Sequence, residues 1–305
     1  LFSIRGIDLR LHVTFPLILI WAGLQFGLSS GTLSSALFGV VAISLLFVLV
    51  TLHELGHSFA AQYFDVPVKQ IVLSPLGGVA QLNRIPEKPW QEFIIAIAGP
   101  AVNVLMAILM GLTALTLGLS IGDPFTALNG TGGFTLTALF TYVFIYNIFL
   151  ALFNLLPAFP LDGGRLFRAL LAMRLDYVKA TNIAANVGRI VAVMMGLYGL
   201  FNGSIFLALI ALFIFTAGRQ EAQYVQLRSR LRGFTVQQVY SPSVYRLTPI
   251  STVQQASHMM ILGRQRSFPV VDQEMLIGFL TQREIIAAQR TAAPHSLVSA
   301  FMRRD

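Results

Sequence analysis

Two histidines and a glutamate in residues 52–57 have the types and spacing of a metal-dependent hydrolytic site. On a helix, residues four apart share a face, so His53 and His57 can both reach one metal ion. Glu54 follows the first histidine directly, where a carboxylate can take a proton from a water that the metal has acidified. The pattern predicts His53 and His57 as metal ligands and Glu54 as the catalytic base.

This motif lies at the end of an apolar stretch. Residues 41–52 contain one serine and one threonine among otherwise apolar side chains. The bare motif arises by chance fairly often, but ionisable groups at membrane depth are costly and are functional candidates by default. The context therefore favours a metal site within a membrane protein.

The composition is that of an integral membrane protein. Of the 305 residues, 55% are hydrophobic and 11% are charged, and the mean hydropathy is +0.72. Soluble domains carry about 25% charged residues. The chain has no cysteine, which excludes disulfides, thiolate metal ligands and a cysteine nucleophile. The net charge of +8 comes from Lys and Arg scattered between apolar runs, so the bilayer and not nucleic acid is the expected partner.

A third metal ligand is expected in the break that follows the fourth apolar run. Two prolines interrupt the helix there, and two glycines after Asp162 let the backbone turn sharply. Catalytic zinc commonly takes three protein ligands and one water, and Asp162 can be the third. The alternative is that Asp162 caps the next helix, which is predicted over residues 163–173. The nearby Asp176 lies among basic residues and suits a solvated loop better.

Six apolar runs predict about six membrane spans. They cover approximately residues 13–28, 36–63, 92–119, 134–156, 183–200 and 204–217. The last two can alternatively form one re-entrant hairpin. Lys and Arg occur before the first run and after the second, fourth and sixth, which predicts cytoplasmic termini and a cytoplasmic-side metal site. The expected location is a bacterial or archaeal plasma membrane.

Short strands are predicted near the metal motif. Residues 68–73 and 78–82 have strand patterns on either side of a Ser-Pro-Leu-Gly turn, which predicts a small hairpin or sheet. The hairpin is either an ordinary connection or an edge to which an extended substrate can add. Residues 1–11 are expected to lie along the membrane interface. Asn103, an amide within the third run, is expected to bond another helix, with substrate binding as the alternative.

The chain becomes more polar after Gly218. We therefore divide it into a membrane domain at residues 1–218, a basic linker at 219–233 and an α/β domain at 234–305. In the last of these, residues 251–262 and 282–289 are predicted to be helices and residues 268–272 and 276–280 strands. The chain starts without methionine and ends abruptly, so we expect it to be a fragment of a longer protein.

With these motifs in place, the chain resembles the site-2 protease family of intramembrane metalloproteases. The resemblance rests on His53-Glu54-Leu55-Gly56-His57, on Gly99-Pro100-Ala101-Val102-Asn103, and on Asn154-Leu155-Leu156-Pro157 running to Pro160-Leu161-Asp162-Gly163-Gly164-Arg165. It implies one zinc ion per chain held by His53, His57 and Asp162, with Glu54 activating water and Asn154 positioning the substrate carbonyl. The implied substrates are single-pass membrane proteins cut within their transmembrane segments, as in regulated intramembrane proteolysis.

Residues 234–290 resemble a CBS domain. The matching pieces are residues 247–253, 268–272 and 277–284, and residues 296–303 resemble the opening of a second copy. The resemblance implies a regulatory module, a homodimer through paired CBS regions and an adenosine nucleotide in the cleft between copies. Glu284 departs from the Asp found in many nucleotide-binding copies.

Two competing interpretations differ in class. A transporter or channel gated by a CBS module explains the spans, but it does not explain the motif at His53 together with Asp162. A catalytically inactive membrane scaffold is disfavoured because every expected ligand is present.

Overall fold

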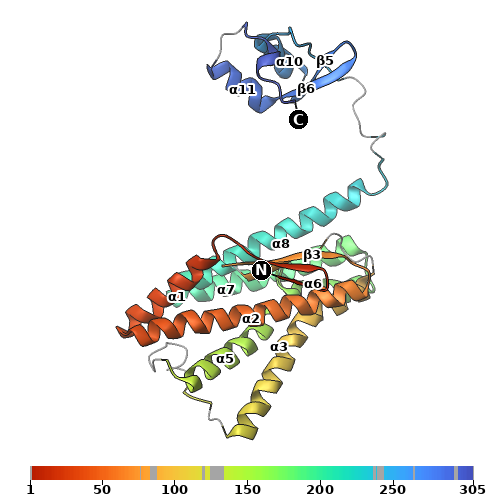
Figure 1. The fold of residues 1–305 in the computed structure, drawn as a ribbon. Coiled ribbons are helices and arrows are strands. Elements are labelled where there is room, and N and C mark those ends of the chain that lie inside the picture. The colour runs from red at the N-terminus through yellow and green to blue at the C-terminus, as the bar shows by residue number, and fades with distance from the viewer. Residues whose placement is uncertain are drawn as a thin grey trace. The chain divides into compact units, whose positions relative to one another are not determined.

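The computed structural model describes residues 2–75, 77–82, 88–118, 121–123, 134–235, 238, 244–263, 265–291 and 295–304. The chain divides into two compact units, Leu1–Leu231 and Arg232–Asp305. The first unit is mostly helical with a small sheet, and the second is a small α/β fold (Figure 1). Each unit is described by itself.

Long helices build the first unit. Among the described residues, those of 16 residues or more are α1 (Phe15–Ser30), α2 (Leu33–Tyr63), α3 (Pro89–Leu117), α5 (Leu136–Asn154), α7 (Tyr177–Phe201) and α8 (Ile205–Leu231). All of these except α1 are long and apolar enough to cross a membrane. At 16 residues, α1 is shorter than the ~20 residues that a 30 Å hydrocarbon core requires. Each of the six predicted runs overlaps one of these helices, and the last two are the separate helices α7 and α8 of 25 and 27 residues.

Glycines allow these helices to approach closely. A Cβ atom on Gly39 of α2 would lie 2.7 Å from the carbonyl oxygen of Ala22 in α1. A Cβ atom on Gly56 would lie 2.8 Å from the carbonyl oxygen of Ala98 in α3. Helix association in lipid depends on such packing, because lipid tails are as apolar as the side chains. The second contact holds the histidine-bearing turns of α2 against α3.

A four-stranded sheet accompanies α2. Its strands lie in the order β1 (Phe2–Ile4), β2 (Ile7–Leu11), β3 (Val68–Ser74) and β4 (Gly77–Leu82). The outer pairs are antiparallel, whereas β2 and β3 are parallel and are joined by the α1–α2 crossover. The predicted hairpin of residues 68–82 is confirmed as β3–β4. Residues 2–11, which are predicted to lie along the membrane interface, form a second hairpin, β1–β2.

The N-terminal hairpin has a local cause. Arg5 and Gly6 have φ angles of 49° and 79°, and two-residue hairpin turns with positive φ match the twist of the flanking strands. Ile7 and Leu9 are buried and alternate with charged residues, which is the period of a strand with one buried face. The alternation covers only the four residues 7–10, so the sequence signal is weak.

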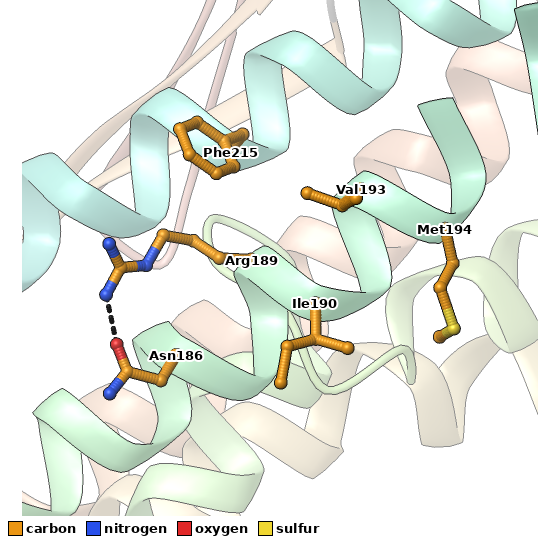
Figure 2. Close-up of a pocket in the computed structure, with 6 residues that line it drawn as sticks. All are labelled: Asn186, Arg189, Ile190, Val193, Met194 and Phe215. Atoms are coloured by element: carbon orange, nitrogen blue, oxygen red, sulfur yellow. Dashed lines mark hydrogen bonds between the residues drawn. The ribbon is translucent and has the colours of Figure 1, made fainter. Parts of the chain in front are cut away.

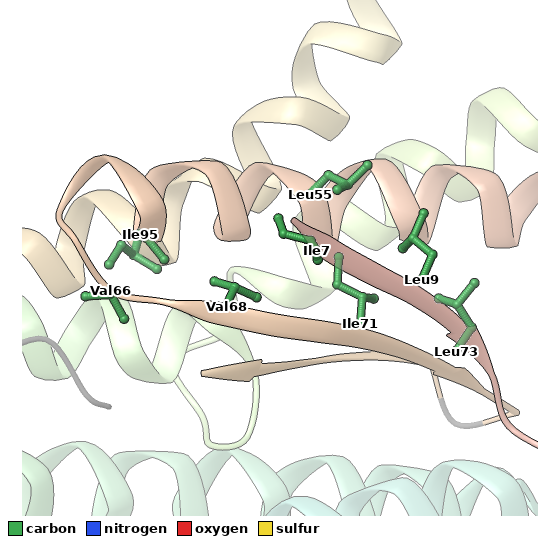
Figure 3. Packing of buried hydrophobic residues seen from close by; sticks show 9 residues of the cluster. Ile7, Leu9, Leu55, Val66, Val68, Ile71, Leu73 and Ile95 are labelled. Atoms are coloured by element: carbon green, nitrogen blue, oxygen red, sulfur yellow. The ribbon is translucent and has the colours of Figure 1, made fainter. Parts of the chain in front are cut away.

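The buried face of the sheet packs on α2 (Figure 3). The cluster comprises Ile7, Leu9, Leu55, Ala61, Val66, Val68, Ile71, Leu73 and Ile95. At 100° per residue, Leu55 lies about 200° around the helix from His53, so the sheet covers the face opposite the histidines. Burying one large aliphatic side chain contributes ~1.5–3 kcal/mol. The cluster therefore fixes the rotation of α2 about its own axis.

The second unit contains the predicted helices and strands. Helix α10 (Val253–Gly263) precedes the antiparallel strands β5 (Ser267–Asp272) and β6 (Met275–Thr281), and α11 (Gln282–Thr291) follows them. A short 3₁₀ helix, η1 (Val298–Ala300), comes last. The segment that resembles a second copy packs on this same unit, because Arg303 and Phe279 exchange two backbone hydrogen bonds of 2.8 Å.

A buried arginine ties the short helix α6 (Asp162–Ala172) to three membrane helices. Arg168 is 2% exposed, and its Nε donates to Glu92 Oε1 of α3 at 2.8 Å. It also pairs with Glu221 of α8, while the hydroxyl of Tyr177 in α7 donates to Glu92 Oε2 at 3.1 Å. Buried charges are tolerated where they are paired in this way. The network holds α6, which begins with Asp162, against α3, α7 and α8.

Replacing Arg168 with methionine should lower the free energy of unfolding by about 3–5 kcal/mol, because Glu92 would stay buried without a counter-charge. Thermal unfolding of the detergent-solubilised protein measures this loss. The double variant Arg168→Met/Glu92→Leu should recover part of it, because the Glu92 charge is removed as well. Arg230→Met, on the exposed end of α8, is the matched control. A single variant as stable as wild type would contradict the assigned role of the network.

Candidate metal centre

Three potential ligand atoms converge between α2 and α6. His53 Nε2 lies 3.0 Å from Asp162 Oδ2 and 3.1 Å from His57 Nε2, and His57 Nε2 lies 3.1 Å from the same carboxylate oxygen. The side chains of His53, His57 and Asp162 are 4%, 12% and 14% exposed. His53 and Asp162 are 109 positions apart in the sequence. The fold thus gathers two neighbouring histidines and a distant carboxylate into one cluster that can hold a metal ion.

The hydrogen bonds behind the two rings determine which nitrogen atoms face the cluster. His53 Nδ1 lies 3.3 Å from Asn103 Oδ1, and His57 Nδ1 lies 2.7 Å from the carbonyl oxygen of Ile95. Both partner atoms can only accept, so each Nδ1 must carry the proton and donate it. Each Nε2 is then left with a free lone pair directed at the cluster. Such outer hydrogen bonds are typical of histidines that bind metals.

The cluster fits zinc. Ligands placed tetrahedrally at ~2.0–2.1 Å from zinc are separated by roughly 3.3 Å, close to the 3.0–3.1 Å separations seen among these three atoms. Two unprotonated nitrogens and a carboxylate oxygen repel one another at this distance unless a cation lies among them. Nitrogen and carboxylate ligands in a set of three are those of catalytic zinc sites.

One face of α3 is shaped around the histidines. Ile95, Gly99 and Asn103 follow one another at four-residue spacing, so they occupy successive turns of the same face. Ile95 and Asn103 supply the oxygen atoms that accept hydrogen bonds from the two histidine rings. A Cβ atom on Gly99 would lie 2.6 Å from His57 Cε1 and 2.8 Å from His53 Nε2. Only glycine leaves room for both rings at this position.

Asp162 is directed at the histidines and does not cap its helix. Leu161 occupies the N-cap position of α6 without a side-chain cap, and Asp162 is the first helical residue. A carboxylate is also stabilised by the helix dipole at this position. Any side chain on Gly163 would overlap the carbonyl oxygen of Leu155, and a Cβ atom on Gly164 would lie 2.6 Å from the carbonyl carbon of Ala158. The two glycines therefore let the proline-containing segment between α5 and α6 fold tightly over the start of α6.

Glu54 lies beside the cluster and next to strand β4. It follows His53 directly, which rotates it 100° around α2 from that ligand. A Cβ atom on Gly78 of β4 would lie 2.7 Å from Glu54 Cγ. The backbone of β4 therefore passes directly over the Glu54 side chain.

The two asparagines singled out in the sequence differ in their surroundings. Asn103 is 1% exposed and bonds His53 of another helix, which is the first of its two expected roles. Asn154 is the half-buried last residue of α5, next to Leu155, whose carbonyl lies against Gly163. Sequence reasoning missed Asn147, a fully buried amide of α5 whose Nδ2 donates to the backbone oxygen of Asn103 at 2.8 Å. The sequence feature that could have pointed to Asn147 is an amide side chain within an apolar run.

Glu284, in the second unit, forms part of a helix cap. Its carboxylate accepts from the backbone N–H of Thr281 at 2.9 Å and also from the Thr281 hydroxyl. The bond from the Thr281 N–H is the glutamate half of a capping box at the start of α11. The hydrogen bond from the Thr281 side chain holds the pKa of Glu284 below its usual value. The carboxylate is thus already bonded to the protein's own backbone.

Comparison with known proteins agrees with this geometry. Residues 41–195 match peptidase family M50, and residues 236–291 match the CBS domain. A zinc metalloprotease of Methanocaldococcus jannaschii is 36% identical over 279 residues, which cover 91% of this chain and 76% of that protein. A Synechocystis protein that also carries a zinc-metalloprotease name is 29% identical over 98% of this chain and 80% of its own length. The solved structure of a site-2 protease from Methanocaldococcus jannaschii superimposes with a TM-score of 0.54 at 37% identity, covering 73% of this chain and 94% of that one.

The fold and the cluster define an integral membrane protein of the zinc metalloprotease class. The chain belongs to peptidase family M50, the site-2 proteases, and carries a CBS domain after its membrane unit.

Replacing Gly99 with alanine should displace the two histidine rings, because the new methyl group would occupy their space. We expect zinc bound per chain, measured by elemental analysis, to fall well below that of wild type. Gly111→Ala is the matched control, since it lies on the same helix and a Cβ atom there meets nothing within 4 Å. Zinc content that is equal in the two variants would contradict the assigned role of Gly99.

Proposed function

We propose that this protein is an intramembrane endopeptidase that cuts the transmembrane segments of membrane-anchored substrate proteins. The observation that carries the proposal is the converging cluster of His53, His57 and Asp162 among helices long enough to span a membrane. We assign these three residues as the zinc ligands and Glu54 as the general base. A channel or transporter has no use for a carboxylate placed beside such a cluster.

Each protein group has a defined part in this chemistry. Zinc would supply a Lewis acid that polarises the scissile carbonyl and acidifies water. The rings of His53 and His57 are held in orientation by α3, which keeps both Nε2 lone pairs available. Glu54 takes a proton from the attacking water and returns it to the leaving amine nitrogen. We assign Asn103 to orienting His53, and Asn154 to contacting the substrate carbonyl.

The substrate path runs along β4. This strand is the outermost of the order β1–β2–β3–β4 in the described sheet, and its Gly78 lies against Glu54. An extended peptide can add to such an edge through backbone hydrogen bonds without requiring one particular sequence. The cut segment must be unwound, because a helix keeps its carbonyl oxygens in internal hydrogen bonds.

Glu54→Gln tests the chemistry directly. The amide cannot accept the proton, so cleavage of a reconstituted single-pass substrate should fall by at least about 100-fold, whereas zinc content stays at the wild-type value. Thr51→Val, one turn earlier on α2, is a control that should retain cleavage. Cleavage by Glu54→Gln at the wild-type rate would exclude Glu54 as the base, and loss of zinc would leave its catalytic role without support.

We infer that both ends of the membrane unit face the cytoplasm of a bacterial or archaeal cell, because Arg and Lys concentrate at α6 and at the end of α8. The chain has no cysteine, so single-cysteine variants report orientation cleanly. Asn202→Cys lies in the α7–α8 turn and Arg230→Cys near the end of α8, and both positions are exposed. A membrane-impermeant maleimide added to intact cells should label the first and spare the second. The reverse pattern would invert the topology.

We also infer that the CBS region regulates cleavage through α8. This helix runs to Leu231, directly before the second unit, and its Glu221 pairs with Arg168 of α6. Because α6 begins with Asp162, a shift of α8 can reach the metal centre through one ion pair. Glu221→Gln should lower the cleavage rate severalfold with zinc retained, whereas Arg230→Gln should not. Unchanged cleavage in Glu221→Gln would contradict this coupling.

A further inference from the structure

An arginine lies near the midpoint of the apolar helix α7. Within the described part of the chain, the guanidinium of Arg189 donates to the neutral amide oxygen of Asn186 and has no carboxylate partner. The neighbouring Ile190 and Met194 are 60% and 58% exposed on a helix long and apolar enough to cross a membrane. A charge among lipid-exposed apolar side chains is costly and is generally paired. Arg189 therefore requires an anion that this helix does not supply.

The arginine borders a groove of about 420 Å³ on the surface of the α7–α8 hairpin (Figure 2). The groove is lined by Asn186, Arg189, Ile190, Val193 and Met194 of α7 and by Phe215 of α8. The α7 residues form one stripe at helical spacing, about 12 Å long at 1.5 Å per residue. Figure 2 shows the polar pair at one end of this stripe and Met194 at the other. The groove is thus polar at one end and apolar along the rest.

A second arginine, Arg219, follows Phe215 on α8 and is not itself one of the residues that line the groove. Gly218 of α8 lies against α7, with its Cβ position 3.7 Å from the carbonyl oxygen of Ala185, which sets the register of the two helices. Arg219 is one helical turn beyond Phe215 on the same face of α8. Phe215 lines the groove, and Arg219 is the next residue of that face toward the basic end of α8. Guanidinium groups match phosphate oxygens in both geometry and charge.

We propose that this groove binds one anionic phospholipid. The phosphate lies between Arg189 and Arg219 and accepts from the Arg189 guanidinium, and one acyl chain follows Ile190, Val193 and Met194 beside Phe215. The order of polar and apolar residues along α7 matches the order of head group and chain in a lipid. The polar end also points toward the basic end of the hairpin, where α8 carries Arg228 and Arg230 in its last turn. An apolar helix of another protein would leave Arg189 without a counter-charge.

Native mass spectrometry of the full chain in detergent tests this site. The protein is equilibrated with dioleoyl phosphatidylglycerol or with dioleoyl phosphatidylcholine at equal concentration, and bound lipid per chain is counted. Wild type should retain one phosphatidylglycerol with a preference of about fivefold or more, because each arginine near the surface favours an anionic lipid by about that factor. Arg189→Met should abolish the preference, Arg189→Lys should keep part of it, and Arg230→Met should keep it fully.

A second variant covers the case in which Arg189→Met does not fold. Met194→Trp fills the apolar end of the groove and leaves both arginines in place, so it should also lose the retained lipid. Equal retention of the two lipids by wild type would overturn the proposal. Undiminished phosphatidylglycerol binding by either Arg189→Met or Met194→Trp would do the same, because the lipid would then bind elsewhere or another occupant would use the groove.

Discussion

The hydrogen bonds that the two histidine rings donate to α3 hold His53 and His57 in their orientation within the cluster. Ile95 and Asn103 each accept from one ring, and Gly99 between them leaves the rings their space. A lipid-embedded helix cannot rely on water to orient its polar side chains, so the neighbouring helix has to provide this orientation. The close α2–α3 approach at Gly56 makes these contacts possible. The geometry of the cluster therefore depends on a packing contact between two apolar helices.

The third member of the cluster, Asp162, depends on a different constraint. Asp162 lies far in sequence from the two histidines, so it is positioned by the folding of the proline-broken segment before it and by the buried network around Arg168. That network spans α3, α6, α7 and α8, whereas the histidines are held by α2, α3 and the sheet. Two structural subsets thus meet at the cluster of His53, His57 and Asp162. A movement of either subset changes the ligand separations, which gives a physical route by which α8 can influence catalysis.

The sequence predicts the parts of this site that are local. The helical spacing of His53 and His57 and the proline-broken segment before Asp162 each carry a signal within a few residues. The β3–β4 hairpin and the second unit's helices and strands also follow from short patterns. Orientation by Ile95 could not be predicted, because a backbone carbonyl has no side-chain signature. The parallel pairing of β2 with β3 joins segments about 60 residues apart, and the buried network of Arg168, Glu92, Tyr177 and Glu221 joins four helices. Such pairings are decided by tertiary packing.

The central claim is that His53, His57 and Asp162 together bind one zinc ion. The most direct measurement is zinc per chain, determined by elemental analysis of wild type and of Asp162→Ala after the same mild chelator wash. The account predicts one zinc in wild type and a marked loss in the variant, because two histidines alone leave the ion without its third protein ligand. A wild-type protein without zinc, or an Asp162→Ala variant that retains a full equivalent, would contradict it.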